Sequence, residues 1–202
     1  MMNTIRLPLG VYQASCYVIH EENSTSCCVL DPGGEAKKVL ELLQNRNLTL
    51  EAILLTHGHF DHVGAVKELH DATGCKVYLC TEDCTMPPKW TAGELFYTDS
   101  FGEGIQLDLA GLTIHVLHTP GHTPGSVCLL VDDTIFSGDT LFAGSCGRTD
   151  LPGGDPEKLL ASLARLAALE GDYTVCPGHS ASTTLAREKQ YNPFIKKALA
   201  AE

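Results

Sequence analysis

The stretch LLTHGHFDHVGAV, residues 54–66, gathers three histidines and an aspartate directly behind an apolar run. Its pattern, His-x-His-x-Asp-His, comprises His57, His59, Asp61 and His62. This spacing is typical of a loop and not of one helix face, so it can direct two imidazoles at one metal ion and the Asp-His pair at another. Neutral imidazole and carboxylate groups are ligands of zinc and of other divalent metals. The stretch therefore predicts a metal site where a buried strand ends.

Three further polar side chains follow apolar strands in the same way. Each lies at a turn where a glycine allows the backbone to change direction: His122 in LHTPGHTPGS, Asp139 in FSGDTLF and His179 in CPGHS. Side chains at such strand ends can converge from distant parts of the chain. We therefore expect two metal sites that share Asp139, because a carboxylate has two oxygens. The expected ligands are His57, His59 and His122 for the first site, and Asp61, His62 and His179 for the second.

Other polar residues carry a weaker signal. The isolated histidines are expected at the surface or in the core: His20, His70 and His115. His118 lies in the same turn as His122 and either supports a ligand from behind or makes a structural hydrogen bond. Asp31, in the Asp-Pro-Gly-Gly turn after a strand, either steadies the histidine loop or is an ordinary turn aspartate.

Composition and charge exclude several classes of function. A chain of 202 residues with 44% hydrophobic residues can bury one substantial core, so residues 1–202 are expected to form a single domain. Its formal net charge is −11 and its 14 Lys and Arg residues are scattered, whereas nucleic-acid binding needs a basic stripe. The chain has no apolar run of about 18 residues, which a membrane helix needs. We expect neither nucleic acid nor membrane as a partner. A small anionic substrate stays possible because bound cations reverse the local charge.

The cysteines indicate the compartment. The chain has nine cysteines and its start, MMNTIRLPLG, has no apolar export signal, so we expect free thiols in a reducing cytoplasm. An odd number of cysteines cannot pair completely within one chain. Cys27 and Cys28 are adjacent in an apolar stretch and are expected to pack in a strand. The spacings of the next three match no common zinc pattern, so they are expected to be structural: Cys75, Cys80 and Cys84.

Apolar patterning predicts alternating strands and helices. Short apolar runs bounded by Gly, Pro or Asp predict strands within 16–34, 49–55, 75–80, 112–118, 126–132, 133–139 and 173–180. Helical spacing predicts helices within 35–47, 62–74, 155–169 and 183–190, with Asp155 capping the third and Pro156 in its first turn. Residues 82–104 are expected to be irregular and either shape a pocket mouth or serve packing. Strands that carry ligands at their ends, mixed with helices, predict two sheets with helices outside them.

The motifs THGHFDH, TPGHTPGS, SGDTLF and CPGHS, in this order, resemble those of the metallo-β-lactamase fold superfamily. The resemblance covers the chain from about residue 31 to residue 180, and all seven ligand positions match. It implies an α+β fold, the four-layer αββα sandwich, with a binuclear site at one edge of the two sheets. The stretches GDTLFAGSCGRTDLPGGDPEKLLASL and REKQYNPF are further similar to the short glyoxalase II-type hydrolases of bacteria.

This resemblance implies a thioester hydrolase. The substrate class would be S-2-hydroxyacylglutathione, usually S-D-lactoylglutathione, and the products a 2-hydroxy acid and glutathione. Two divalent metals, zinc first and iron or manganese as alternatives, would lower the pKa of a bridging water so that hydroxide attacks the thioester carbonyl. Asp61 would accept a hydrogen bond from this nucleophile in addition to binding metal. A thiolate leaving group needs no dedicated acid, which agrees with the absence of an evident Ser-His-Asp triad.

The chain departs from the family in two places. We expect it to be without the extra C-terminal helical domain of long glyoxalase II enzymes, and it has Ser180 after the last histidine, where short members often have glycine. Both departures admit thioesters other than glutathione conjugates. Arg148, in SCGRTD, matches the position where a basic residue of the family approaches the glycine carboxylate of glutathione. A structural pairing with Asp150 is the alternative, and the sequence predicts no oligomeric state.

Two other functions compete with this prediction. A persulfide dioxygenase of the same fold uses one iron and has GCGRTD-like sequences, but Phe60 and the Pro-Gly-Gly after Leu151 favour the hydrolase. A non-catalytic zinc-binding protein is the other, although structural zinc sites tend to be closed, single and rich in cysteine. A β-lactamase is disfavoured by the missing export signal and by a carboxylate in place of a cysteine ligand. An RNA-processing nuclease is disfavoured by the negative charge and the missing nucleic-acid domain.

Overall fold

The computed structural model describes residues 1–200, which contain two large β-sheets. The first sheet has six strands that lie side by side in chain order: β1 (Met2–Leu9), β2 (Ala14–Glu21), β3 (Ser26–Leu30), β4 (Thr49–Leu54), β5 (Lys76–Leu79) and β6 (Asp99–Ser100). The second sheet has the order β14 (Thr183–Thr184), β13 (Thr174–Pro177), β10 (Thr134–Gly138), β9 (Val127–Val131), β8 (Leu112–His118) and β7 (Gln106–Leu109). A separate hairpin pairs β11 (Leu141–Phe142) with β12 (Ser145–Cys146).

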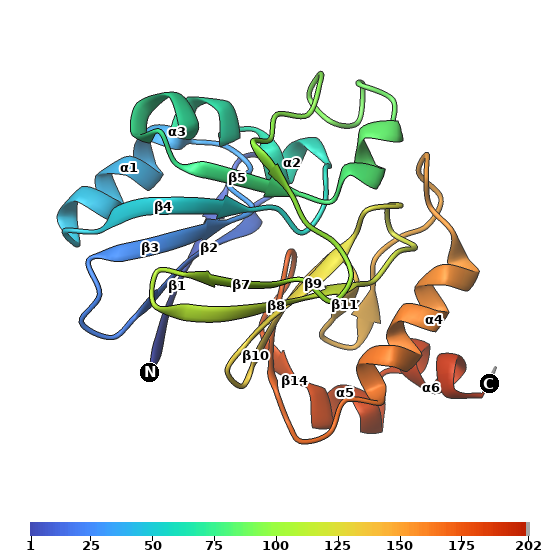
Figure 1. Ribbon diagram of the computed structural model, residues 1–202. Coiled ribbons are helices and arrows are strands. Elements are labelled where there is room, and N and C mark those ends of the chain that lie inside the picture. Colours follow the sequence, from blue (N-terminus) through green and yellow to red (C-terminus); the bar gives the residue numbers. More distant parts are fainter. Residues whose placement is uncertain (201–202) are drawn as a thin grey trace.

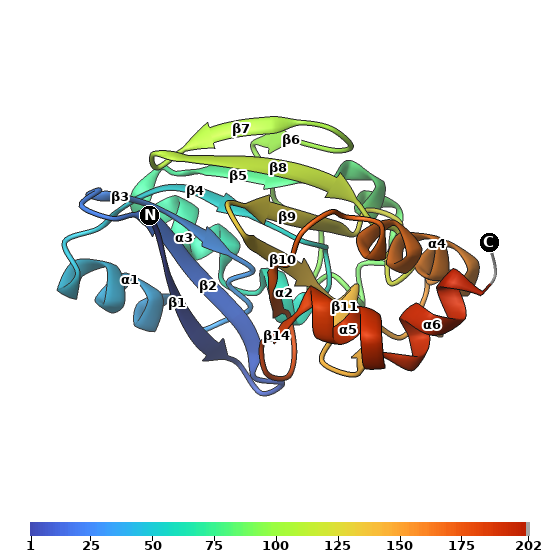
Figure 2. The same ribbon diagram turned by 90° about the horizontal axis from the view of Figure 1, so that it is seen from below.

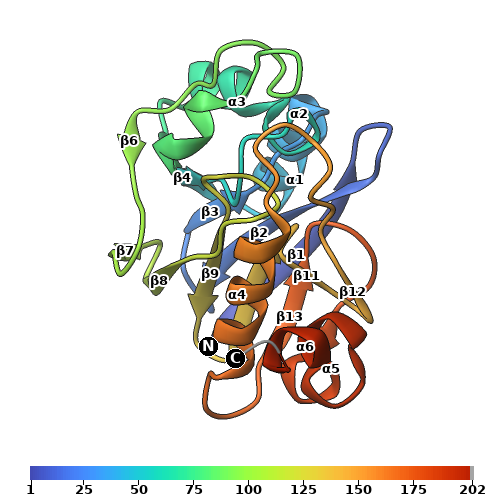
Figure 3. The ribbon, with the colours of Figure 1, turned by 90° about the vertical axis from the view of Figure 1, so that its right-hand side faces the viewer.

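Helices cover the outer faces of both sheets. They are α1 (Ala36–Asn45), α2 (Phe60–Val63) and α3 (Val66–Thr73) beside the first sheet, and α4 (Pro156–Ala167), α5 (Leu185–Tyr191) and α6 (Pro193–Leu199) beside the second. Figure 1 shows the two groups of helices on opposite sides of the paired sheets. Figures 2 and 3 show the same layers from below and from the right-hand side. The chain therefore has the α+β fold and the four-layer αββα sandwich that its motifs predict.

Three apolar clusters separate these layers. In β3, Cys28 and Leu30 face the core between the sheets, whereas Cys27 and Val29 face the helices α1 and α3. Successive side chains of a strand point to opposite faces, so a strand buried on both faces needs a continuous apolar run. The stretch SCCVL of β3 is such a run, and the packing expected for its two cysteines is confirmed. The third cluster joins the second sheet to α4, α5 and α6.

Local signals account for the ends of several helices. The side chain of Asp155 accepts hydrogen bonds from the backbone N–H groups of Glu157 and Lys158, at 3.0 Å each, and Pro156 begins α4. The predicted N-cap is therefore confirmed. Gly74 follows α3 with a φ of 71°, a left-handed conformation that ends helices. Within residues 1–200, no helix combines the length and the hydropathy that crossing a membrane would need.

The single helix expected over residues 62–74 is wrong, because the structure divides it into α2 and α3. The backbone N–H of Ala65 donates to the carbonyl of Pro32 at 2.9 Å, so it cannot continue the helical hydrogen bonds. A Cβ on Gly64 would lie 2.4 Å from the carbonyl oxygen of Gly33, so only glycine allows this approach. The break packs the Asp-Pro-Gly-Gly turn against the histidine loop.

Some short or exposed strands were not predicted from the sequence. Strand β1 pairs only with β2, is partly exposed and carries Pro8, which is tolerated on an edge strand. Strand β7 and the hairpin of β11 and β12 have too few residues for an apolar period. Residues 82–104 are largely irregular, as expected, with a short 3₁₀ helix at Thr81–Thr85 and the two-residue β6.

The core between the sheets gives a stability prediction. Phe136 is 1% exposed, and its ring meets that of Tyr17 edge-on with centroids 5.2 Å apart. We expect Phe136→Ala to lower the free energy of unfolding by about 3–5 kcal/mol, because it removes buried apolar surface and leaves a cavity. Tyr191→Ala, at a side chain that is 60% exposed, should change it by about 0.5 kcal/mol or less. Urea unfolding measures both, and a similar small change in the two variants would contradict the packing described.

Candidate metal centre

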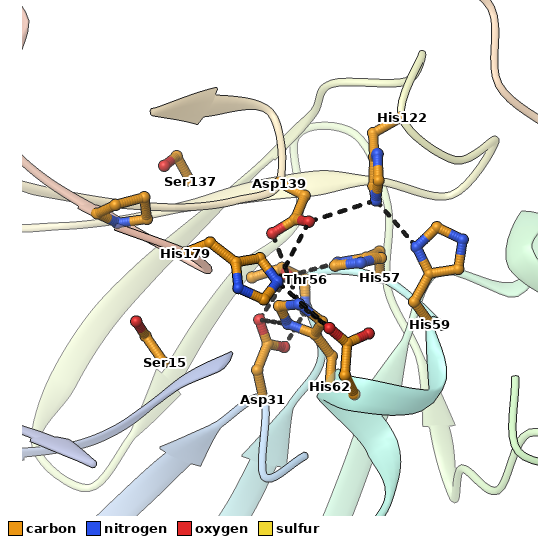
Figure 4. Close-up of polar contacts among 12 residues, drawn as sticks. Ser15, Asp31, Thr56, His57, His59, His62, His122, Ser137, Asp139 and His179 are labelled. Atoms are coloured by element: carbon orange, nitrogen blue, oxygen red, sulfur yellow. Dashed lines mark hydrogen bonds and ion pairs between the residues drawn. The ribbon is translucent and has the colours of Figure 1, made fainter. Parts of the chain in front are cut away.

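The candidate metal centre lies at one edge of the sandwich, where strands of both sheets end. Asp31 directly follows β3, Asp139 directly follows β10, and His179 comes two residues after β13. In the first sheet β3 and β4 are parallel, and in the second sheet β10 and β13 are parallel. The carboxyl ends of these strands therefore meet at one edge. Figure 4 shows the side chains pointing toward one another from both sheets.

All seven residues predicted as ligands come together at this edge. Several groups have donor atoms within 4.8 Å of one another: His57, His59 and His122 form one, and Asp61, His62 and His179 form another. A third group, Asp31, His57 and His62, overlaps both. Asp139 lies between the groups, with Oδ1 at 3.5 Å from His62 Nε2 and Oδ2 at 3.5 Å from His122 Nε2. The first two groups contain the residues expected for the two metal sites, and their role as ligands stays a prediction.

The carboxylate of Asp31 determines how two of the histidine rings are oriented. Asp31 Oδ2 accepts hydrogen bonds from His62 Nδ1 at 3.0 Å and from the Thr56 hydroxyl at 2.6 Å. Because the Thr56 hydroxyl donates to Asp31, it accepts from His57 Nδ1, which lies 3.1 Å away. Nδ1 of both rings thus carries a hydrogen, and Nε2 is left to face the centre. Of the two roles considered for Asp31, the structure shows the one that steadies the histidine loop.

His122 is oriented from the second sheet. Its Nδ1 donates to the carbonyl of Arg148 at 2.8 Å, so its Nε2 faces the centre and lies 2.9 Å from His59 Nδ1. Gly147 packs against this ring. A Cβ there would lie 1.8 Å from the carbonyl oxygen of Asp139 and 3.1 Å from His122 Nδ1. Glycine is therefore required in the SCGRTD segment for the ring to reach its place.

Four buried polar atoms of the centre lack a hydrogen-bond partner among residues 1–200: His57 Nε2, His59 Nε2, His62 Nε2 and Asp139 Oδ1. Such atoms are rare in folded proteins, and each costs about 1–3 kcal/mol when nothing compensates it. Imidazole nitrogens and a carboxylate oxygen are the donor set of zinc and of similar divalent metals. The residues present therefore fit a centre that binds metal.

Two histidines of the first group, His57 and His59, are kept uncharged. Burial, followed by the neighbouring histidines His62 and His122, lowers the pKa of His57 well below its usual range. Burial and His122 likewise lower the pKa of His59 to about 4. Both rings are therefore neutral at pH 7, which is the form of imidazole that binds metal.

The second group contains coupled charges. Burial acts to lower the pKa of His62, but the carboxylates of Asp139 and Asp31 outweigh it and raise the pKa to about 9. Burial acts to raise the pKa of Asp61, but the hydrogen bond from His179 and the charge of His62 outweigh it and hold the pKa at about 2. The hydrogen bond with Asp61 raises the pKa of His179. In the metal-free chain this half is therefore an ion-pair network.

The loop that carries His179 is held by the first sheet. Three donors from β1 and β2 bind carbonyl groups on either side of this histidine: Ser15 N to Gly178 at 2.7 Å, Tyr17 Oη to Pro177 at 2.8 Å and Arg6 Nη2 to Ser180 at 2.8 Å. Ser180 adopts a φ of 74°, the left-handed region that favours glycine. The position of His179 thus depends on contacts between the two sheets.

A cavity of about 410 Å³ opens beside the centre. Its apolar wall consists of Tyr12, Phe60, Trp90, Phe142 and Leu151. Tyr12, from the turn between β1 and β2, packs edge-on against Phe60 with ring centroids 5.4 Å apart. Arg148 also lines the cavity, and its guanidinium forms hydrogen bonds of 2.7 and 2.6 Å with Asp150. The cavity therefore combines an apolar wall with a cation and the donor groups, as small-molecule sites do.

Several sequence expectations are resolved by these contacts. The ring of His118 donates to the carbonyl of Pro124 at 2.9 Å, which is a structural hydrogen bond, and His118 does not line the cavity. Residues 82–104 were expected either to shape a pocket mouth or to serve packing, and they do both: Trp90 lines the cavity, whereas Phe96 packs against His70. The role of Thr56 was not predicted from the sequence, although a hydroxyl next to the first histidine was a usable signal. The place of Tyr12 on the cavity wall was not predicted either, because a residue in an exposed turn carries no such signal.

The ion-pair network predicts how stability depends on pH. An unfolded histidine has a pKa of about 6.5, whereas the pKa of folded His62 is raised to about 9. A raised pKa stabilises the folded chain below the unfolded value, and this contribution is lost as pH rises toward the folded value. The urea concentration at the unfolding midpoint of chelator-treated protein should therefore decrease as the pH rises from about 6.5 to about 9. His62→Gln should show a smaller fall, and equal slopes for the two proteins would contradict the network.

The chain is similar to known proteins along nearly its whole length. Among curated proteins, an uncharacterized protein of Mycobacterium leprae is 38% identical, covering 94% of this chain and 96% of that protein. The hydroxyacylglutathione hydrolase GloC of Haemophilus influenzae is 34% identical, covering 96% of this chain and 98% of that protein. Both relatives match along nearly the whole of the sandwich.

Solved structures match equally well. The BLEG-1 B3 metallo-β-lactamase superposes with a TM-score of 0.87 at 36% identity, covering 96% of this chain and 99% of that one. TTHA1623 in a di-iron-bound form gives 0.85 at 40% identity, with coverages of 94% and 99%. ETHE1 from Myxococcus xanthus gives 0.84 at 27% identity, with coverages of 99% and 91%. Residues 9–179 match the metallo-β-lactamase superfamily, and the chain belongs to this superfamily.

Proposed function

We propose that the chain is a metal-dependent thioester hydrolase whose substrate is an S-2-hydroxyacylglutathione such as S-D-lactoylglutathione. The observation that carries the proposal is Asp139, placed between two groups of three donors beside an open cavity. Structural zinc sites are single and closed, whereas adjacent donor groups that share a carboxylate suit hydrolysis with two metals. The Haemophilus relative named as a hydroxyacylglutathione hydrolase supports the substrate class.

The proposed ligands are His57, His59 and His122 for one ion, Asp61, His62 and His179 for the other, and Asp139 for both. Two bound divalent ions would supply a water activated near neutral pH and would polarise the thioester carbonyl. Zinc is the metal we propose first. Iron is an alternative supported by the similar di-iron-bound structure, and the same donor set accepts manganese.

Asp61 supplies the chain's own contribution to water attack. With a pKa of about 2 its carboxylate is ionised at neutral pH, so it accepts a hydrogen bond from the attacking water and orients it. Asp61 lines the cavity, and its Oδ2 lies 3.3 Å from His179 Nε2, which holds the carboxylate in place. The leaving thiolate has a conjugate acid with a pKa of about 8.5, so no dedicated proton donor is needed.

The cavity would orient the substrate. The aromatic wall, with Phe60, Trp90 and Phe142, packs against the carbon chain beside the thioester and excludes water from it. We assign the glycine carboxylate of glutathione to Arg148, which would exchange its contact with Asp150 for the substrate. Guanidinium and carboxylate form paired, charge-assisted hydrogen bonds, so the exchange keeps the geometry of the interaction.

The thiols of the chain suit a reducing compartment, and we propose the cytoplasm. Within residues 1–200 all nine cysteines are free, and seven of them are buried. Burial raises the pKa of Cys27 to about 12 and the pKa of Cys128 to about 11, which keeps both as unreactive thiols.

Two other activities compete for the same centre. One is a persulfide dioxygenase of the same fold, which would use one iron. The two groups of three donors favour a centre with two metal ions instead. The other is β-lactam hydrolysis, because the B3 metallo-β-lactamase structure is 36% identical over nearly the whole chain. The open cavity also distinguishes all three enzymes from a non-catalytic zinc protein.

A substrate panel tests the proposal. Protein of measured metal content would be assayed with S-D-lactoylglutathione and other acylglutathiones, with a β-lactam, and for oxygen uptake with glutathione persulfide. We expect the acylglutathiones to be hydrolysed and Asp61→Asn to lower kcat/KM by about 100- to 10,000-fold, the usual range for a positioned acid or base. Asp108→Asn, an exposed carboxylate on β7, is the matched control and should retain activity. Oxygen uptake or β-lactam turnover without thioester hydrolysis would overturn the proposal.

The role assigned to Arg148 gives a separate prediction. Arg148→Gln should raise KM for S-D-lactoylglutathione about tenfold or more, while kcat stays within about twofold, because the contact is made equally in the ground and transition states. For S-lactoyl-N-acetylcysteamine, which has no carboxylate, the variant and the unsubstituted chain should give the same kinetics. An equal rise in KM for both thioesters would contradict a contact with the carboxylate and would favour the structural pairing with Asp150.

A further inference from the structure

Asp83 is a fully buried carboxylate outside the proposed ligand set. It lies in the short 3₁₀ helix after β5 and has 0% exposure. Its Oδ2 accepts hydrogen bonds from Gly58 N at 2.7 Å and from the Thr123 hydroxyl at 3.0 Å, and its Oδ1 accepts one from Gly125 N at 2.6 Å. Burying a carboxylate costs free energy unless the group is well hydrogen-bonded. The three donors to Asp83 compensate this cost.

The donors come from the two loops that carry the first group of proposed ligands. Gly58 lies between His57 and His59, and Thr123 directly follows His122. The two loops are far apart in the chain and belong to different sheets. Asp83 therefore bonds to both loops, to Gly58 N on one and to Gly125 N and the Thr123 hydroxyl on the other.

The other half of the centre is held differently. Asp31 bonds to His62 directly and to His57 through Thr56. No hydrogen bond within residues 1–200 joins Asp83 to Asp61, His62 or His179. The two buried carboxylates thus bond to overlapping but different parts of the centre, and Asp83 adds hydrogen bonds to both the His57–His59 loop and the His122 loop.

We propose that Asp83 is a positioning residue that sets the metal affinity of the His57, His59 and His122 group without contacting the metal. The inference rests on the ligand set of the proposed function. Residues behind a metal ligand typically change metal affinity by about 10- to 100-fold when they are replaced. Asp83 acts one step further back, through the backbone of two loops, and so determines the distance between ligands from different sheets.

The chemistry of the carboxylate makes asparagine an informative replacement. Gly58 N and Gly125 N donate to different oxygens of Asp83, so both oxygens must accept. An asparagine of the same shape has one oxygen and one NH₂ group, and the NH₂ cannot accept from an N–H. Asp83→Asn therefore releases one loop. The space is fixed as well, because a Cβ on Gly125 would lie 2.8 Å from both Asp83 N and Asp83 Oδ1.

The experiment measures zinc affinity in two backgrounds. His179→Ala disables the second group and His122→Ala disables the first, so each background keeps one intact group. Zinc affinity would be determined by competition with a chromogenic chelator, independently of any catalytic activity. We expect Asp83→Asn to weaken zinc binding by about 10- to 100-fold in the His179→Ala background and by less than about threefold in the His122→Ala background.

A second variant protects the test against poor folding. Thr123→Val keeps the shape of the side chain and removes one donor to Asp83, so it should weaken zinc binding in the same background by a smaller factor. Glu188→Gln is the matched control. Glu188 is also fully buried and accepts from a backbone N–H, that of Gly144, and from a threonine hydroxyl, that of Thr183. Its hydrogen bonds within residues 1–200 reach neither of the two loops that Asp83 joins. It should leave both affinities unchanged.

The outcomes separate this inference from the proposed function. Equal weakening in both backgrounds, or none in the His179→Ala background, would overturn the role of Asp83. Failure of the unsubstituted chain to bind two zinc ions would refute the ligand set, and this inference with it. Binding of two ions by a chain that hydrolyses no thioester would refute only the proposed function.

Discussion

The hydrogen bonds of the Asp31 carboxylate are the contacts on which the candidate centre most depends. At 2.6 Å from the Thr56 hydroxyl and 3.0 Å from His62 Nδ1, this carboxylate leaves Nε2 of two imidazoles facing inward. Without it, His57 and His62 could present either nitrogen, and the buried ring atoms would have no defined direction. Asp31 itself has a φ of 48°, an uncommon backbone conformation that places its side chain beneath the histidine loop.

The other polar side chains of the centre are positioned by strands of both sheets that end at one edge of the sandwich. Parallel pairs in each sheet bring Asp31, Asp139 and His179 to the same place. Close packing then admits only glycine at neighbouring positions. A Cβ on Gly178 would lie 2.3 Å from Asp139 Oδ1, and a Cβ on Gly33 would lie 1.6 Å from the carbonyl oxygen of Asp61. The glycines of the motifs are therefore part of the site, because they let ligand-bearing loops approach one another.

Much of the architecture could be read from residue patterns, and the failures have physical causes. Strands buried on both faces, such as β3, carry continuous apolar runs and were predicted, whereas the edge strand β1 and the short β7 carry no such run. The helix expected over 62–74 is divided because Ala65 bonds to Pro32, a contact from another part of the chain. The proposed ligands were found because each stands at a polar turn after a strand. Asp83 follows β5 in the same manner but belongs to no recognisable motif, so its contacts became visible only in three dimensions.

The sequence by itself determined membership in the metallo-β-lactamase superfamily, and it predicted the donor groups and their partition into two sets around Asp139, because residue type and order along the chain carry that information. The tertiary structure alone decided which ring nitrogen faces the centre, which carboxylates hold the loops, and that the turn between β1 and β2 places Tyr12 on the cavity wall. The reason is distance along the chain. Asp83 and Gly125 are separated by 42 residues, and Tyr17 and Pro177 by 160, so these contacts exist only when the two sheets pack together.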